Sequence, residues 1–313
     1  PAAALDPAMA VSQYVHRNWR VQDGLPQNRV EDIAQTPDGY VWVATDEGVA
    51  RFDGLAFTRF DKRNTPAFEA SHLVRALEVD RAGQLWIGTN GGGLVRHARG
   101  RFERFTAAQG LTANQISALC VDARGTLWVG TLDDGLFYLR DGRFARYVPA
   151  PDLASRKVTA LYADRSGTLW VGTDRGLHRL HGGRSTVYGQ ADGLSDDFVL
   201  ALYADRAGTL WVGTRKGLDR VQGGVVRGDV PAGVPPGVAV FSMWEDAGGS
   251  LWLGTDGRGL VRVRDGRAEA FTEGDLLHDR ILSIFQDHEG SLWAGAEAGG
   301  LHRFHAGKFT VYG

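Results

Sequence analysis

Short runs of alternating apolar and polar residues recur along the whole chain. In one unit, Gln115 to Val121 alternates in this way and predicts a half-buried strand. A tight turn follows at Asp122 to Gly125, and then come a second strand at Thr126 to Thr131, a third at Leu136 to Arg140 and a fourth at Arg143 to Val148. No stretch shows a convincing helical period, so the pattern predicts short antiparallel strands joined by turns.

The same unit occurs seven times, and a tryptophan marks its second strand. These residues are Trp42, Trp86, Trp128, Trp170, Trp211, Trp252 and Trp293, with successive differences of 44, 42, 42, 41, 41 and 41 residues. A fixed period of this length is typical of equivalent supersecondary units in an array. The fold class predicted is therefore all-β, a seven-bladed β-propeller of four-stranded antiparallel blades. The strand periodicity excludes a solenoid of helix pairs.

The composition agrees with this fold and narrows the classes of function. The 313 residues include 43 glycines, which lie mostly at the turns of the repeat. The formal net charge is −2, so nothing indicates a nucleic-acid or membrane surface. The single cysteine, Cys120, makes no internal disulfide and is expected to be a small buried residue. No apolar run approaches the roughly 20 residues of a membrane span.

The repeated tryptophans and Asp-x-x-Gly turns are expected to be structural. Seven aromatic residues suggest carbohydrate stacking, but a tryptophan placed identically in every blade is better suited to sealing each sheet against its neighbour. A buried tryptophan covers roughly 200 Å². The glycine two residues later, Gly130 in the third unit, leaves room for that contact. The turns lack the number of oxygen ligands that calcium requires.

Two segments compete for one strand position near the termini. Residues 1–10 are rich in Ala and Pro and predict a flexible N-terminal segment, followed by a single propeller over residues 11–313. Tyr14 to Arg20 aligns with a fourth strand, yet the last unit already has a candidate fourth strand at Lys308 to Tyr312. Either Tyr14 to Arg20 pairs elsewhere, or the natural chain continues into a second array. We favour the second alternative, a fragment of a longer protein.

Candidate ligand-binding residues lie at positions that vary between the blades. Propellers bind ligands over the central channel, beside the loop that leads into the first strand and the turn between the second and third strands. These two places predict a channel-face set: Arg29, Asp46, His72, Asn90, Gln115, Asp133, Arg156, Lys157, Asp174, Arg175, Arg215, Lys216, Asp256, Arg258, Arg280 and Glu297. The set carries both signs of charge, with an Arg/Lys cluster in units 4 and 5, which suits a polar or anionic ligand.

The sequence contains no catalytic or metal-binding motif of a recognisable kind. The nine histidines form no His-x-His or His-Glu-x-x-His pattern, and neither a Gly-x-Ser-x-Gly motif nor a phosphate loop occurs. We therefore expect no cofactor, no metal and no enzyme in this segment. Two alternatives stay open. One is a lyase or glycosidase whose site is assembled across blades, and the other is a protein-interaction scaffold with an apolar patch on one face.

The repeat motif resembles that of the two-component regulator propeller family. In the third unit it reads Gly110-Leu111-Thr112-Ala113-Asn114-Gln115-Ile116, then Asp122 to Thr131 as DARGTLWVGT, then Gly135-Leu136. The opening Trp19 to Asn28, WRVQDGLPQN, is similar to the family's usual start. Units 2 and 6 depart from the motif in the loops leading into their first strands, and the resemblance covers nearly the whole chain.

This resemblance implies the periplasmic sensor of a membrane-bound signalling protein. Two such propellers are commonly followed by a β-sandwich, a membrane helix and a cytoplasmic output module, either a histidine kinase or a diguanylate cyclase. The resemblance also implies an oligosaccharide or another small polar ligand over the channel. A further propeller or the β-sandwich is the implied partner domain, and the full-length protein is expected as a homodimer that binds no nucleic acid.

Overall fold

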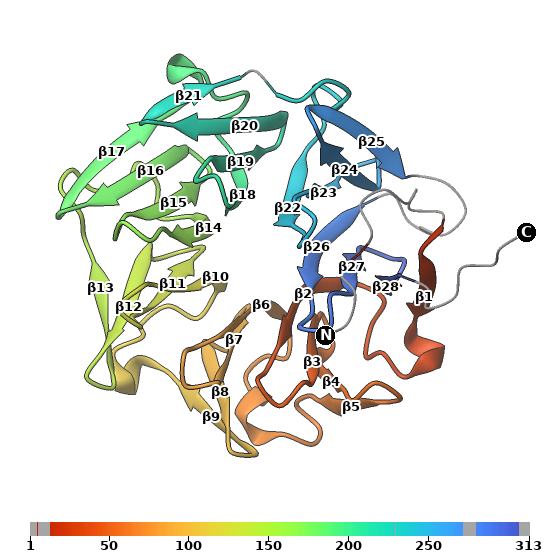
Figure 1. The fold of residues 1–313 in the computed structure, drawn as a ribbon. Coiled ribbons are helices and arrows are strands. Elements are labelled where there is room, and N and C mark those ends of the chain that lie inside the picture. Colours follow the sequence, from red (N-terminus) through yellow and green to blue (C-terminus); the bar gives the residue numbers. More distant parts are fainter. Residues whose placement is uncertain (1–4, 6–12, 229, 272–279, 307–313) are drawn as a thin grey trace, which may run out of the picture.

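The chain folds as a ring of seven sheets, which confirms the predicted seven-bladed β-propeller (Figure 1). The computed structural model describes residues 5, 13–228, 230–271 and 280–306. Each sheet has four antiparallel strands, and six of the seven sheets follow chain order from the innermost to the outermost strand. The described part of the chain contains no helix longer than one 3-10 turn.

The first three blades have closely similar strand lengths. Blade 1 consists of β2 (Val30–Gln35), β3 (Val41–Thr45), β4 (Gly48–Phe52) and β5 (Phe57–Phe60). Blade 2 consists of β6 (Val74–Val79), β7 (Leu85–Thr89), β8 (Leu94–Ala98) and β9 (Arg101–Phe105). Blade 3 consists of β10 (Ile116–Val121), β11 (Leu127–Thr131), β12 (Leu136–Arg140) and β13 (Arg143–Tyr147).

Blades 4 to 6 repeat the arrangement, with a short outer strand in blade 5. Blade 4 consists of β14 (Val158–Ala163), β15 (Leu169–Thr173), β16 (Gly176–His181) and β17 (Arg184–Tyr188). Blade 5 consists of β18 (Val199–Ala204), β19 (Leu210–Thr214), β20 (Gly217–Gln222) and β21 (Val225–Arg227). Blade 6 consists of β22 (Val240–Glu245), β23 (Leu251–Thr255), β24 (Leu260–Arg264) and β25 (Arg267–Phe271). The 3-10 turns are η2 (Val21–Asp23), η3 (Pro66–Phe68), η4 (Ala107–Gln109) and η5 (Gln190–Asp192).

The N-terminal strand completes the last blade. Blade 7 consists of β26 (Ile281–Gln286), β27 (Leu292–Ala296), β28 (Leu301–His305) and, on its outer side, β1 (Val15–Trp19). The antiparallel register pairs Trp19 with Leu301 and Val15 with His305. Tyr14 to Arg20 therefore occupies the fourth-strand position that its alignment predicts, while the rival segment Lys308 to Tyr312 lies outside the described residues. Of residues 1–10 only Leu5 is described, and its side chain is buried in the core near Trp252 and Leu260.

The repeated tryptophans form the packing between blades, as predicted. Six of the seven are at most 9 % exposed, and Trp42, Trp252 and Trp293 are at 1 %. The glycine two residues later makes the close approach possible. A β-carbon at Gly130 would lie 2.5 Å from the Cγ1 atom of Val158 in the next blade.

The Asp-x-x-Gly turns fix both the hairpin and the tryptophan. In blade 6, Oδ1 of Asp246 accepts a hydrogen bond from the main-chain N–H of Ser250, and Oδ2 accepts one from Nε1 of Trp252 at 2.7 Å. The same bond to Nε1 recurs in blades 2 to 7. In blade 1 the hydroxyl of Thr36 accepts it instead. These aspartates are thus structural, as predicted.

Candidate functional site

The loops leading into the first strands and the turns after the second strands meet at one end of the ring. Within blade 3, the main-chain N–H of Leu132 donates to the carbonyl of Gln115 at 3.0 Å. Between blades, the N–H of Gly135 donates to the carbonyl of Arg156 at 2.9 Å. Equivalent bonds join these two places for blades 2, 4, 5, 6 and 7. The two kinds of segment chosen from the sequence therefore do share one face, which we call the channel face.

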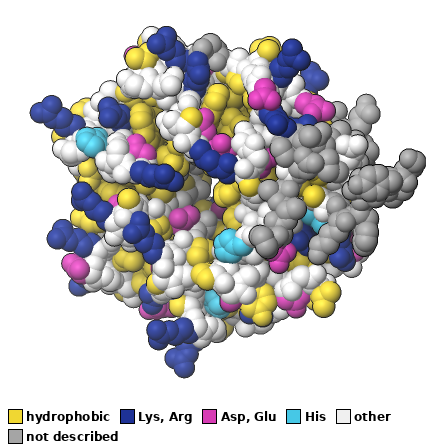
Figure 2. Space-filling model, in the orientation of Figure 1, with side chains coloured by type: hydrophobic (Ala, Val, Ile, Leu, Met, Phe, Trp, Pro, Cys, Tyr) yellow, Lys and Arg dark blue, Asp and Glu magenta, His cyan; other side chains and the backbone are white. Residues whose placement is uncertain are grey.

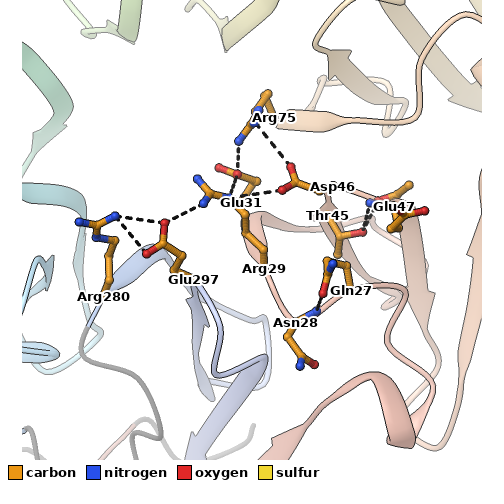
Figure 3. A network of polar contacts seen from close by, with 11 residues as sticks. Gln27, Asn28, Arg29, Glu31, Thr45, Asp46, Glu47, Arg75, Arg280 and Glu297 are labelled. Atoms are coloured by element: carbon orange, nitrogen blue, oxygen red, sulfur yellow. Dashed lines mark hydrogen bonds and ion pairs between the residues drawn. The ribbon is translucent and has the colours of Figure 1, made fainter.

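A chain of ion pairs crosses blades 6, 7 and 1 on this face, and Figure 3 shows its part from Arg280 through Glu297 to Arg29. The guanidinium of Arg280 lies 2.9 Å from the carboxylate of Asp256 and 3.0 Å from that of Glu297. Glu297 in turn accepts a hydrogen bond from Arg29 at 2.7 Å. Four of the predicted residues are thereby brought together, although Arg29 and Glu297 are 268 positions apart in the chain.

Two residues that the sequence reading missed extend this network into blade 2. Glu31 accepts hydrogen bonds from both Arg29 and Arg75, and Arg75 also lies 3.5 Å from the carboxylate of Asp46. Glu31 and Arg75 occupy the same place in their blades, at the register shift after the first residue of the inner strand. Such a β-bulge turns a side chain out of the regular alternation. A polar residue at this position of the repeat is the sequence feature that could have identified Glu31 and Arg75 as channel-face residues.

Two arginines of the network have raised pKa values. Burial lowers the pKa of Arg29, but the hydrogen bond to Glu31 and the nearby carboxylates outweigh it and raise the pKa overall. The hydrogen bond to Asp256 is the main cause of the raised pKa of Arg280. Three arginines (Arg29, Arg75 and Arg280) face four carboxylates (Glu31, Asp46, Asp256 and Glu297). On this side of the channel face every arginine of the network is therefore paired within a pre-organised array, in which the carboxylates outnumber the arginines by one.

Blades 4 and 5 present a different kind of surface. The Arg215 guanidinium carbon lies 3.7 Å from the ring centre of Phe198, and Nζ of Lys157 lies 5.2 Å from it. Arg156, Lys157, Arg175 and Arg215 have no carboxylate within 4.0 Å among the residues that the structure describes, whereas Lys216 pairs with Asp196 at 3.2 Å. The predicted Arg/Lys cluster thus consists mainly of cations without a carboxylate partner.

The remaining predicted residues belong to blades 2, 3, 4 and 6. His72 is 3.8 Å from Glu47, and Asn90 forms an isolated β-bridge with Gln115. The Oδ1 atom of Asp174 is buried and accepts no hydrogen bond. Asp133 and Arg258 are exposed. Figure 2 shows Lys and Arg side chains spread over the face turned to the viewer, with Asp and Glu among them and no extended basic patch.

Two half-buried acidic residues on the inner strands, Asp32 and Glu78, were also missed. Oδ2 of Asp32 accepts a hydrogen bond from the N–H of Leu77, and Oε1 of Glu78 accepts one from the N–H of Val121, each in the next blade. Burial raises the pKa of Asp32 to about 7 and that of Glu78 to about 8, although these hydrogen bonds oppose the shift. Both groups join neighbouring inner strands, and their raised pKa values bring their titration into the range around neutral pH.

The described residues offer no metal site and no membrane span. Among them, no group of three or more His, Cys, Asp or Glu side chains is arranged to hold a metal ion. No described helix has the length and apolar character needed to cross a bilayer. Cys120 is a free thiol, and burial raises its pKa to about 12, so it is not a thiolate nucleophile.

The repeats of this ring match a family model described as "Two component regulator propeller". The matched segments are residues 24–47, 69–91, 110–133, 152–175, 193–216 and 275–298, which take in six of the seven blades. They contain the turn and tryptophan motif on which the blade geometry depends. The chain therefore belongs to the two-component regulator propeller family. A sequence comparison with curated proteins gives no match.

Solved structures with the same fold come from sensors and from enzymes. The chain is similar to the extracellular domain of the hybrid two component system BT3049 from B. thetaiotaomicron, with a TM-score of 0.84 and 24 % identity over 94 % of this chain and 42 % of that one. It is similar to the corresponding domain of BT4673 from B. thetaiotaomicron, with a TM-score of 0.76 and 19 % identity over 93 % and 39 %. Virginiamycin B lyase from Staphylococcus aureus has a TM-score of 0.73 and 15 % identity over 93 % and 98 %.

Proposed function

We propose that this chain is the extracytoplasmic ligand-sensing propeller of a membrane-bound signal-transduction protein. The proposal is supported by the family match and by the likeness to extracellular domains of hybrid two component systems. In a bacterium with two membranes, this places the propeller in the periplasm. The segment itself carries no chemistry, and a histidine kinase or diguanylate cyclase outside it generates the output.

The chain is the length of one propeller, whereas these relatives are longer. It spans 42 % of the BT3049 domain and 39 % of the BT4673 domain. A further propeller or a β-sandwich of the same protein is therefore the partner that we propose, in a homodimer of the full-length protein. Ligand binding shifts the dimer between arrangements only to the extent that its affinity for them differs.

The observation that carries the ligand proposal is the contrast between the two sides of the channel face. The arginines of blades 7, 1 and 2 are neutralised by their own carboxylates. Lys157 and Arg215 instead flank one aromatic ring and lack a carboxylate partner among the described residues. We place the ligand over blades 4 and 5, where a small polar or anionic group, such as that of an oligosaccharide, satisfies these cations.

The test is a ligand screen with matched variants. The purified chain is screened by thermal shift against neutral and acidic oligosaccharides, and hits are measured by calorimetry. The double variant Lys157→Ala, Arg215→Ala should weaken binding at least tenfold. The control Lys216→Ala, which removes a cation already paired with Asp196, should leave it within twofold. Equal effects of the two changes would refute the placement.

A propeller lyase is the competing function, because the virginiamycin B lyase fold covers nearly the same length. A likeness at 15 % identity carries the fold alone. Incubating the chain with a streptogramin B or with the oligosaccharide hits, followed by mass spectrometry of the products, separates the two functions. Turnover that is lost on heat denaturation would replace the sensor proposal with an enzyme.

A further inference from the structure

One of the seven repeat tryptophans departs from the others. Trp128 of blade 3 is only partly buried, whereas the other six are at most 9 % exposed. Its Nε1 still donates to Asp122 at 3.0 Å, so the side chain is held in the usual position. The difference therefore lies in what surrounds the ring and not in the ring's own placement.

The residue paired with this tryptophan in the third strand is also exceptional. In six blades an arginine pairs with the repeat tryptophan across the ladder: Arg51, Arg96, Arg179, Arg220, Arg262 and Arg303. In blade 3 the partner is Tyr138, whose ring centre lies 5.5 Å from that of Trp128. Tyr147 packs edge-on against Trp128 at 5.2 Å. In four of the other blades the arginine lies over the tryptophan ring, and in blade 3 an aromatic cluster takes its place.

The neighbouring blade leaves open space beside this cluster. Its outer hairpin turns at Gly182 and Gly183, with φ of +58° and +78°, and a β-carbon on either glycine would meet no atom within 4 Å. A cleft with a volume of 420 Å³ lies between blades 3 and 4 at this point, on the side of the Asp-x-x-Gly turns and away from the channel face. Trp128 and both glycines line it. This volume falls within the range of about 300–1,000 Å³ typical of small-molecule sites.

The walls of the cleft carry balanced polar groups. Asp122 and Asp164 come from the turns of blades 3 and 4, and burial is outweighed at both by hydrogen bonds that lower the pKa, so both carboxylates are ionised. Arg124 and Arg165 come from the same two turns. Two carboxylates and two guanidiniums give no net charge, so neither an anion nor a cation is favoured as a whole.

We infer that this cleft is a second ligand site, separate from the channel face, for a neutral ring-shaped polyhydroxylated molecule such as a sugar residue. The apolar face of a pyranose ring packs against an aromatic side chain, and here Trp128 supplies it. Hydroxyl groups both donate to carboxylates and accept from guanidiniums, so they use both signs of charge at once. Because Gly182 has no side chain, the hairpin turn leaves room in the cleft for the sugar ring.

The turn offers a variant that changes the cleft and keeps the hairpin. Gly182→Asp recreates the Asp-Gly turn of blades 3 and 6, where Asp141 and Asp265 already adopt φ of +49°. The new side chain narrows the cleft and adds a third carboxylate. The matched control is Gly223→Asp, the same change in the Gly223-Gly224 turn of blade 5, which does not line this cleft.

The chain and its variants are tested on an array of neutral and acidic oligosaccharides, and the strongest neutral binder is then titrated by calorimetry. We expect Gly182→Asp and Trp128→Ala to weaken that binder at least fivefold, while Gly223→Asp and the double variant Lys157→Ala, Arg215→Ala leave it within twofold. The last variant separates this site from the one proposed on the channel face. Failure to retain any neutral glycan, or binding insensitive to Gly182→Asp, would overturn the inference.

Discussion

At the scale of single residues, the blade depends on one aspartate whose carboxylate accepts hydrogen bonds from two different parts of the blade. Its carboxylate holds the main-chain N–H groups of the turn and also fixes the tryptophan that seals the blade against its neighbour. Blade 1 shows that the tryptophan requires only a hydrogen-bond acceptor, because there the hydroxyl of Thr36 accepts the bond from Trp42. The repeat tolerates this exchange since one acceptor at the same distance along the chain satisfies the indole N–H.

Replacing such an aspartate should lower the free energy of unfolding most where the aspartate is buried. Asp246 is 1 % exposed, so Asp246→Ala leaves the indole N–H of Trp252 and the N–H of Ser250 without their acceptor. We expect a loss of about 2–4 kcal/mol in the free energy of unfolding, measured by urea denaturation. The exposed Asp133→Ala should change it by less than about 0.5 kcal/mol. If Asp246→Ala lowered the free energy of unfolding as little as Asp133→Ala, the aspartate of the turn would not be structural.

The half-buried Glu78 makes stability depend on pH. Its folded-state pKa of about 8 lies above that of an unfolded chain, so its contribution is fully present at acidic pH and is lost as the pH rises through about 8. Glu78→Gln keeps a carbonyl for the N–H of Val121 and cannot ionise. The variant should be more stable than the natural chain at pH 9, on the order of 2 kcal/mol, with no gain at pH 5. Denaturation curves at the two pH values that run parallel would contradict this.

At the scale of elements, the ring depends on a strand that comes from the other end of the chain. β1 lies on the outer edge of blade 7, where Trp19 stacks on Trp293 at 5.5 Å and meets the ring of Phe52 at 5.0 Å. Trp19 is 4 % exposed, so the strand is anchored by its last residue against both blade 7 and blade 1. The same strand places His16 beside the buried His302 at 2.9 Å.

Truncating the side chain of Trp19 should weaken the packing of β1 in blade 7, where the ring of blades closes. Trp19→Ala removes a large buried side chain, and we expect a loss of about 3–5 kcal/mol in the free energy of unfolding. Val15→Ala, in the same strand at a side chain that is 46 % exposed, should cost far less. Chemical denaturation measures both variants, and hydrogen exchange should show the loss of protection in β28 first.

At the scale of the whole molecule, a symmetric ring carries an asymmetric distribution of charge. The ion-paired network spans blades 6, 7, 1 and 2, while cations without carboxylate partners gather on blades 4 and 5 of the described chain. The closing strand belongs to the same side as the network. We infer that the paired side serves closure and rigidity, and our proposal places the ligand on the other side, over blades 4 and 5.

Opening the ring should change how the molecule associates. Deleting residues 1–19 removes β1 and leaves the main-chain groups of β28 unpaired at a sheet edge, which invites edge-to-edge pairing with other copies. We expect soluble oligomers or aggregates in light scattering. Deleting residues 1–4 keeps β1 and should leave the association state unchanged. A monomeric product of the longer deletion would show that β1 is dispensable.

The sequence by itself determined the blade, the number of blades and the face on which variable polar residues gather. These follow from alternation, turn chemistry and a period of about 42 residues, which act within one unit. Only the tertiary structure decided that β1 fills the fourth-strand position of blade 7 and that Glu31 and Arg75 join the ion-pair network of the channel face. The contact of Arg29 with Glu297 spans 268 positions, and ring closure, which no local pattern contains, brings these two side chains together.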